Sequence, residues 1–420
     1  MPDPAPLIVF SDDWGRHPSS CQHLISRLLA RRAVTWVNTI GTRPPGLNWS
    51  TVTRGFGKLR EWVWPARPTG PPSLKGRGES ELGASSDVDG ARVPNSPLPF
   101  REGGPGGVGC LSPRVLSPKM WPSFRSRFGR ALNRRLLSRA LAPIARSGGP
   151  PIVVTTLPIT ADLVGAFPAA RWVYYCVDDF SVWPGLDGRT LRDMEAELVP
   201  NVDVCVAVSE TLREHLARLG KPSQLLTHGV DLEFWRAPVP SDTPVSLASV
   251  PALPSPLVVY WGVIDRRTDL ALVRALSCAL REGTILFAGP HDSPDPELAR
   301  VPRVRTLPPI PFADLPSLAS RASVLIAPYA DLPVTRAMQP LKLKEYLATG
   351  KPVVVRALPA TAEWADCADV VSAPEAFAAA VLERLATGLP ESQRTARARL
   401  ESEGWNAKAA QFEQWLDGCA

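Results

Sequence analysis

The segment Gln339–Tyr346 carries residue types that suit the binding of a phosphate-bearing ligand. Pro340 fits the first turn of a helix, where the N–H group that proline lacks is not needed. The free N–H groups and the dipole at a helix N-terminus favour phosphate, and Lys342 adds a positive charge in that turn. Glu345 follows one turn later, where its carboxylate can accept hydrogen bonds from the two hydroxyls of a ribose. Lys342 and Glu345 alone would suit a solvent-facing i,i+3 pair, but between Pro340 and the helix-ending Gly350 they predict a nucleotide diphosphate site.

A second basic position follows the apolar run Leu257–Trp261. Gly262 ends this run, and Arg266 and Arg267 come shortly after it. Both arginines could be routine loop charges. Their place after a strand that ends in glycine favours phosphate contact, for Arg267 more than for Arg266.

Acidic and histidine side chains follow two other apolar runs. Asp178 and Asp179 come directly after the run Trp172–Cys176, and His17 lies in the polar loop after Leu7–Phe10. Either aspartate could bind an acceptor or handle a proton, although Asp179 could simply cap the next helix. These two aspartates are the only candidates for a metal site, and we predict no bound metal.

The elements that must position these residues alternate between apolar runs and helical patterns. Such alternation predicts a parallel sheet with helices on its faces. The predicted strands are Leu7–Phe10, Val34–Asn38, Ile152–Thr155, Trp172–Cys176, Val204–Val208, Leu257–Trp261, Thr284–Phe287, Val304–Leu307, Val324–Ala327, Pro352–Val355 and Asp369–Val371. The fold class is therefore α/β, with two doubly wound, Rossmann-like domains, and ligands are expected in the cleft between the strand ends.

The domain bounds follow from changes in composition. Residues 1–235 form the first domain, 236–256 a Pro/Ser/Ala-rich linker, and 257–420 the second domain with a closing helix at about Trp405–Trp415. Residues 67–111 are so rich in Gly, Pro, Ser and charge that they cannot bury a core, and we predict a disordered insertion there.

A helix is predicted over Phe124–Arg146, where apolar residues recur every four positions. Its seven arginines have no acidic residue among them. Such a helix could be an ordinary domain helix with a charged outer face, or it could bind an anionic membrane surface.

The bulk properties fit a globular protein with anionic partners. The net charge is +6, and 45% of the residues are hydrophobic. Nucleic acid is disfavoured, because the basic residues are not interleaved with aromatic ones on one element. Seven cysteines without a CxxC pair predict reduced, mostly buried thiols. With no signal-peptide pattern and no apolar run of membrane-spanning length, we predict a cytoplasmic protein, or one bound peripherally to the inner face of the cell membrane.

The donor-site pattern resembles a known family. The run Pro340–Val355 is similar to the PLKxxEYLAxGKPVV segment of family 4 retaining glycosyltransferases of the bacterial polysaccharide type, which have the GT-B fold. Further similar segments are Asp13–Leu24, Tyr175–Phe180, His228–Asp231 and Tyr260–Leu270. Many members carry two glutamates eight residues apart; Glu345 matches the second, but Ala337 stands at the first.

The resemblance implies a sugar transfer from a nucleoside-diphosphate sugar to an acceptor hydroxyl with retention, without a cofactor. By the same resemblance, residues 1–235 would be the acceptor-side domain and 257–420 the nucleotide-sugar-binding domain. The acceptor would be a saccharide or a lipid-linked glycan, in exopolysaccharide or cell-envelope synthesis. The implied donor-binding residues are Gly262, Arg266, Arg267, Gln339, Pro340, Leu341, Lys342 and Glu345, and the candidate catalytic residues are His17, Asp178 and Asp179. A sugar-nucleotide epimerase of the same fold and a non-catalytic nucleotide-sugar-binding protein stay as alternatives.

Overall fold

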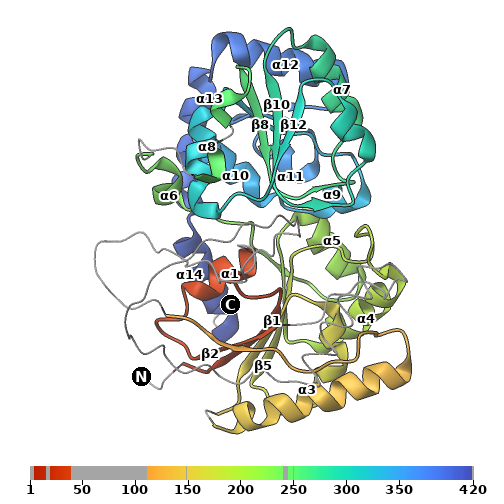
Figure 1. The fold of residues 1–420 in the computed structure, drawn as a ribbon. Helices are drawn as coiled ribbons and strands as arrows, with labels where there is room; N and C mark the ends of the chain where they lie inside the picture. The colour runs from red at the N-terminus through yellow and green to blue at the C-terminus, as the bar shows by residue number, and fades with distance from the viewer. Residues whose placement is uncertain are drawn as a thin grey trace, which may run out of the picture.

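Two parallel sheets with helices on their faces organise the protein (Figure 1). The computed structural model describes residues 4–15, 19–38, 111–147, 149–239, 245–248 and 250–418. The first sheet has the strand order β3-β2-β1-β4-β5-β6-β7, and the second has the order β12-β10-β8-β13-β14-β15. The α/β class and the two Rossmann-like sheets predicted from the sequence are confirmed.

The first sheet lies in the lower part of Figure 1. Its strands are β1 (Leu7–Ser11), β2 (Val34–Asn38), β3 (Arg114–Leu116), β4 (Ile152–Thr155), β5 (Arg171–Cys176), β6 (Val204–Ala207) and β7 (Gln224–Leu225). Its helices are α1 (Ser20–Ser26), α3 (Arg127–Ser147), η1 (Pro158–Leu163), α4 (Gly188–Asn201) and α5 (Glu210–Arg218). We call this sheet and its helices the N-terminal domain.

The second sheet lies in the upper part of Figure 1 and forms the C-terminal domain. Its strands are β8 (Leu257–Trp261), β10 (Thr284–Ala288), β12 (Val304–Leu307), β13 (Val324–Ala327), β14 (Val353–Arg356) and β15 (Asp369–Val371), beside a small pair, β9 (Ile264–Asp265) and β11 (His291–Asp292). Its helices include α7 (Leu270–Ala279), α8 (Leu315–Arg321), α9 (Pro333–Ala337), α10 (Leu341–Ala348), α11 (Pro359–Ala362), α12 (Pro374–Thr387) and α13 (Glu391–Ala396). Short helices α6 (Leu232–Arg236), η2 (Val245–Leu247) and η3 (Val250–Ala252) connect the domains, with η4 (Pro296–Arg300), η5 (Phe312–Asp314) and η6 (Arg397–Glu403) further along.

The central strands are buried on both faces, which explains their uninterrupted apolar runs. Every residue of β1, β4, β8 and β13 is buried. Parallel strands covered by helices on both sides need apolar side chains at odd and even positions alike. The sequence therefore located these strands by continuous hydrophobicity.

The last helix, α14 (Trp405–Asp417), returns to the N-terminal domain, where it lies beside α1 (Figure 1). Trp405, Phe412 and Trp415 belong to the N-terminal hydrophobic core. At its outer end Arg32, 4% exposed, bonds Glu413 at 2.9 Å and Asp417 at 2.6 Å. The chain thus crosses between the domains twice, and the closing helix, which follows the second sheet in sequence, packs on the first.

The Arg-rich helix forms, but it buries a different face from the predicted one. The apolar series from Phe124 in steps of four includes Phe128, which is 71% exposed. The buried residues are Asn133, Leu137, Leu141 and Ala145. These residues also recur every four positions, but their series is offset by one residue from the predicted one, which is about 100° around the helix.

Four short strands, β3, β7, β9 and β11, were not predicted from the sequence because each has only two or three residues. Most of the predicted insertion, 67–110, lies outside the described residues, as does His17. Of the described cysteines, Cys278 is exposed and the others are buried and unpaired. None of the helices in the described ranges is long and apolar enough to span a membrane.

Candidate functional site

The N-terminus of α10 offers backbone N–H groups rather than a side-chain cap. Pro340 occupies the N-cap position, so the helix begins at Leu341, one residue later than the sequence suggested. No side chain caps this end, and no acidic residue lies in its first turn. The first N–H groups of a helix have no partners within it, so they remain available to an anion.

Lys342 lies at this helix end against the tip of β8. Its Nζ is 3.2 Å from the Tyr260 Oη and 4.8 Å from the centroid of the Tyr260 ring. The ring of Tyr329 lies on another side, 5.7 Å away. Within the described part of the chain, no carboxylate comes within ion-pair distance of Lys342. The ammonium group is thus held by aromatic rings, and its charge is left unpaired.

Gly262 is required by this arrangement. Its φ is +135°, and a Cβ built on it would lie 2.0 Å from the Lys342 Nζ. Gly289, at the tip of the neighbouring strand β10, has a φ of +147°, and its Cβ would lie 2.0 Å from the Gly262 carbonyl oxygen. Two glycines therefore let the strand tips and the lysine approach one another. Gly289 was not predicted from the sequence, although it follows an apolar strand just as Gly262 does.

Arg267 is held in place before any ligand arrives. Its guanidinium donates to Asp265 through Nε at 2.9 Å and through an Nη at 2.7 Å. The ring of Trp183, from the N-terminal domain, lies 4.5 Å from the Arg267 Cζ. Arg266, by contrast, is exposed. Arg267 is therefore the arginine that the protein orders at the boundary between the domains.

Glu345 lies one turn into α10 and is 7% exposed. Burial raises the pKa of Glu345 to about 7, while the charge of Lys342 and the Trp261 side chain oppose this rise. The neighbouring Tyr346 is structural: it accepts from the Trp261 N–H at 3.0 Å and donates to the Trp261 carbonyl oxygen. Glu345 is thus a buried carboxyl group beside an unpaired lysine, and Tyr346 fixes the helix against β8.

The loop after β5 brings side chains of the N-terminal domain to the boundary with the C-terminal domain. Asp179 accepts hydrogen bonds from the Ser181 N–H at 3.0 Å and the Ser181 hydroxyl at 2.6 Å, so it shapes the turn that carries Trp183. Burial raises the pKa of Asp178 to about 7; the charge of Arg267 opposes this rise and Asp179 adds to it. The charge of Asp178 is therefore influenced by the arginine of the opposite domain, whereas Asp179 organises its own loop.

Ala337, where the resemblance led us to expect a carboxylate, is 4% exposed. It belongs to the hydrophobic core of the N-terminal domain, and its carbonyl oxygen accepts from the Ser209 hydroxyl at 2.6 Å. The C-terminal end of α9 therefore forms part of the contact between the domains. A charged side chain at 337 would have to be buried in apolar surroundings.

The remaining candidates lie near this boundary but differ in environment. Gln339 is buried, and its Oε1 has no hydrogen-bond partner among the described residues. Burial and the charge of Lys344 lower the pKa of His228 to about 3, so this histidine is neutral at physiological pH. Within the ranges that the structure describes, no group of three His, Cys, Asp or Glu side chains could hold a metal ion.

Comparison with known proteins finds a family that matches the part of the chain containing these residues. Residues 255–387, which include Gly262, Arg267, Lys342 and Glu345, match the family described as glycosyl transferases group 1. A protein of Bacillus subtilis (strain 168) named for teichuronic acid biosynthesis, the putative glycosyltransferase TuaH, is 33% identical over 108 residues. That match covers 25% of this chain and 27% of the relative, so it spans about a quarter of the relative's length.

Solved structures resemble the chain over nearly its whole length. Sucrose-phosphate synthase from Thermosynechococcus elongatus matches with a TM-score of 0.64 at 17% identity, over 99% of both chains. Anabaena HepE in complex with UDP matches with a TM-score of 0.61 at 13% identity, over 98% of this chain and 100% of that one. At these identities the likeness shows the fold, which is GT-B.

Proposed function

We propose that this protein, which belongs to the group 1 glycosyltransferases through residues 255–387, transfers a sugar from a nucleoside-diphosphate sugar to an acceptor hydroxyl with retention. The observation that carries the proposal is the unpaired ammonium of Lys342. It lies beside the uncapped N-terminus of α10, against a glycine that leaves room for it. A cation that lacks a carboxylate partner suits a bound anion. Members of this family transfer sugars from nucleoside diphosphates, so we propose that the anion is a diphosphate.

The proposed reaction depends mainly on electrostatic stabilisation. Breaking the bond between the sugar and the diphosphate places negative charge on the leaving oxygen. Lys342 and the free N–H groups of α10 are already oriented to receive this charge, and their orientation costs nothing during the reaction. Arg267, fixed by Asp265 and Trp183, adds a second cation when the domains close around the donor.

Glu345 is proposed to bind the ribose of the donor. Its carboxylate is one helical turn beyond Lys342, and two hydroxyl groups of a ribose can donate to its two oxygens. These hydroxyl groups would replace the water that the Glu345 carboxylate loses on burial, and their hydrogen bonds favour its ionised form. We therefore expect donor binding to lower the pKa of Glu345 from about 7.

The donor is proposed to be a uridine diphosphate sugar. HepE was solved with UDP and with UDP-glucose, and an Escherichia coli trehalose-6-phosphate protein with UDP-2-fluoro glucose; the latter has a TM-score of 0.59 at 13% identity, over 98% of this chain and 99% of that one. The acceptor side is assigned to Asp178, a carboxyl group on the loop after β5 whose pKa is raised by burial, a rise that the charge of Arg267 opposes. A saccharide or lipid-linked acceptor of cell-envelope or exopolysaccharide synthesis is supported by the partial match to TuaH.

The test is a donor panel with the full chain. Nucleoside diphosphate sugars are screened by thermal shift, and turnover is then measured with the stabilising donor and saccharide acceptors. Lys342→Ala should lower kcat/KM about a hundredfold or more, because it removes a charge aimed at the leaving group. Glu345→Ala should mainly weaken donor binding. Near-normal kinetics of both variants would refute the assignment.

The same assay separates the alternatives. An epimerase would convert the donor to its epimer without an acceptor. A non-catalytic binding protein, which the burial of Ala337 at the domain boundary favours, would bind the donor without turnover.

We also propose a cytoplasmic protein that contacts an anionic membrane surface through α3. The support is the excess of arginine on this helix and the exposed ring of Phe128. Flotation with liposomes that contain or lack anionic lipid tests this proposal, and equal recovery in both would contradict it.

A further inference from the structure

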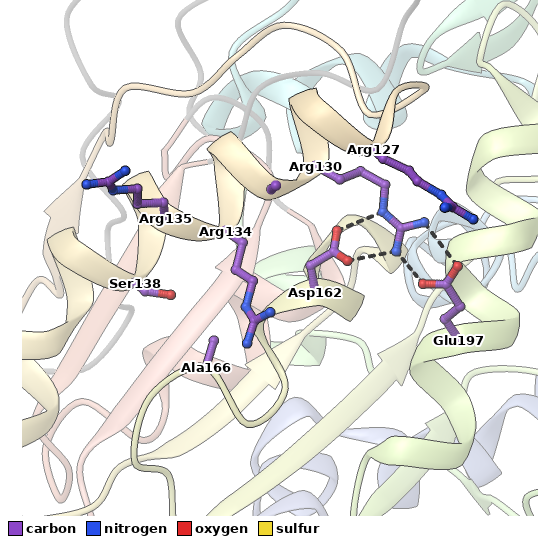
Figure 2. A pocket seen from close by; sticks show the side chains of 9 residues that line it. Arg127, Arg130, Arg134, Arg135, Ser138, Asp162, Ala166 and Glu197 are labelled. Atoms are coloured by element: carbon purple, nitrogen blue, oxygen red, sulfur yellow. Dashed lines mark hydrogen bonds and ion pairs between the residues drawn. The ribbon is translucent and has the colours of Figure 1, made fainter.

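A cavity of about 570 Å³ lies far from the domain boundary, on the outer side of the N-terminal domain (Figures 1 and 2). It is bordered by α3, η1 and α4. Its lining residues are Arg127, Arg130, Ala131, Arg134, Arg135, Ser138, Asp162, Ala166 and Glu197. A volume of this size accommodates a small polar ligand.

One arginine of the cavity is structural. Arg130 donates to Asp162 at 2.7 and 2.8 Å and to Glu197 at 3.0 Å, and so joins α3 to η1 and α4. Figure 2 shows its guanidinium between the two carboxylates. Its hydrogen bond to Glu197, together with its charge, holds the pKa of Glu197 below the ordinary value. Both acidic residues of the cavity are therefore occupied by a single arginine.

The other arginines leave an excess of positive charge. Arg134 extends from α3 toward Ala166, and Arg127 lies beyond Arg130 (Figure 2). In the described ranges, no carboxylate lies within ion-pair distance of Arg127, Arg134 or Arg135. The Ser138 hydroxyl also lines the cavity, and it is buried without a hydrogen-bond partner in the described part of the chain. A concave site thus combines several unpaired guanidinium groups with an unsatisfied hydroxyl.

We propose that this cavity is a second anion site, separate from the donor site, which binds a phosphate-bearing ligand through Arg134 and Ser138, while Arg127, on the other side of Arg130, adds positive charge. Arginine suits phosphate because its planar guanidinium can donate two parallel hydrogen bonds. The Ser138 hydroxyl supplies a third donor. Binding at this cavity does not depend on the proposed sugar transfer.

The surroundings favour the phosphate of a lipid headgroup. Phe128 is 71% exposed and precedes Arg135 by two helical turns, which places both on one side of α3. Trp121 is 42% exposed and packs against Gly129 of the same helix. Exposed aromatic rings beside a phosphate site are expected where a protein rests on a membrane interface.

The first experiment measures binding of inorganic phosphate and of glycerol 3-phosphate to the full chain by calorimetry. Arg134→Ala should weaken binding about tenfold or more, because a charge-assisted hydrogen bond is lost. Arg134→Lys should restore it only in part, since lysine keeps the charge but not the two parallel donors. Arg139→Ala, on α3 but outside the cavity, is the matched control and should bind as the wild type does.

The second experiment repeats the comparison with phosphatidylcholine vesicles that contain or lack phosphatidic acid. Loss of both glycerol 3-phosphate and vesicle binding in Arg134→Ala identifies a lipid headgroup. Loss of glycerol 3-phosphate binding alone identifies a soluble phosphate ligand in the same site. The proposal would be overturned if Arg134→Ala and Arg139→Ala weakened phosphate binding equally, or if Arg134→Ala bound phosphate as the wild type does. Either result would indicate a non-specific attraction between phosphate and the basic helix.

Two further readouts keep this site distinct from the donor site. Lys342→Ala should still bind phosphate at the cavity, although it loses sugar transfer. Arg134→Ala should retain turnover with a soluble acceptor. The failure of either proposal can therefore be recognised without the other.

Discussion

Helices α10 and α3 both carry several basic residues, but the protein holds their charges in opposite ways. On α10, Lys344 is 2% exposed and bonds Glu403, and Lys342 is enclosed by Gly262 and the ring of Tyr260. On α3 the arginines other than Arg130 are mostly exposed. An enclosed charge has lost its water and depends on specific neighbours, whereas an exposed charge acts through a field that salt screens. Substituting a basic residue should therefore have a large, local effect on stability or binding when the residue lies on α10. The same kind of substitution on α3 should have a small effect that depends on salt.

The largest effect is expected on the side of α10 that faces the domain connection. Lys344→Ala leaves Glu403 without its buried partner, and breaking such a pair costs about 3–5 kcal/mol of unfolding free energy. Lys408, 2.8 Å from Glu403, should keep the loss near the lower limit. Denaturant unfolding measures it, with Lys342→Ala as the control on the same helix. Equal losses of unfolding free energy in the two variants would contradict the distinction between Lys344 as a structural lysine and Lys342 as a ligand-binding one.

The pH dependence of stability should reveal the buried Glu345. Its pKa is raised from 4.5 to about 7 by burial, so its favourable contribution is complete below pH 4.5 and is lost as the pH rises through 7. Glu345→Gln does not titrate. Relative to the wild type, it should gain up to about 3 kcal/mol of unfolding free energy between about pH 4 and pH 8. Parallel profiles of the two proteins in denaturant titrations would contradict a buried carboxyl group at this position.

The close approach of Lys342 to Gly262 can be tested with one methyl group. Gly262→Ala places a Cβ where the ammonium lies, and it should weaken donor binding about tenfold to a hundredfold, or ~2 kcal/mol. Gly350→Ala is the matched control. Gly350 also has a positive φ, of +73°, but no atom of the described residues lies within 4 Å of the position that a Cβ would take there. Calorimetric titration of the donor should show a loss in the first variant only.

A smaller effect is expected where the two domains meet. Trp183→Ala removes the ring that lies 4.5 Å from the Arg267 Cζ. A cation–π contact of this kind contributes about 1 kcal/mol, so KM for the donor should rise about fivefold. Trp121→Ala, an exposed tryptophan beside α3, should leave KM unchanged. A rise in both variants would show that the contact has no particular role.

The smallest effect should come from single arginines of α3 outside the cavity. Arg139→Gln should weaken binding to anionic vesicles about twofold, and the difference should vanish in high salt, where the Debye length falls to about 3 Å. Donor binding should depend on salt much less. Flotation and calorimetry at two salt concentrations make the comparison, and an equal salt response of both ligands would remove the contrast between the two helices.

Local pattern was sufficient to place the main strands and the residues proposed to bind the donor within the fold. Continuous apolar runs predicted β1, β4, β8 and β13, because a strand covered on both faces needs apolar residues at every position. The same runs placed Gly262 at a strand tip, and the helix signals placed Lys342 at the start of α10. These features depend on residues that are neighbours along the chain.

Contacts between distant segments could not be predicted in this way. The spacing of apolar residues on α3 suggested that Phe128 would be buried, yet the packing of the domain leaves it exposed and buries Asn133 instead. Nothing in the order of residues indicated that the ring of Trp183 would lie over Arg267.

The sequence by itself determined two α/β units and a helix start that carries Lys342 and Glu345. Only the tertiary structure decided that Lys344, two residues further on, is tied to Glu403, and that Ala337 is buried in the core of the other domain. The physical reason is that a helix orients successive side chains about 100° apart. Lys342 and Lys344 therefore face different surroundings, and those surroundings are built by segments far away in the chain.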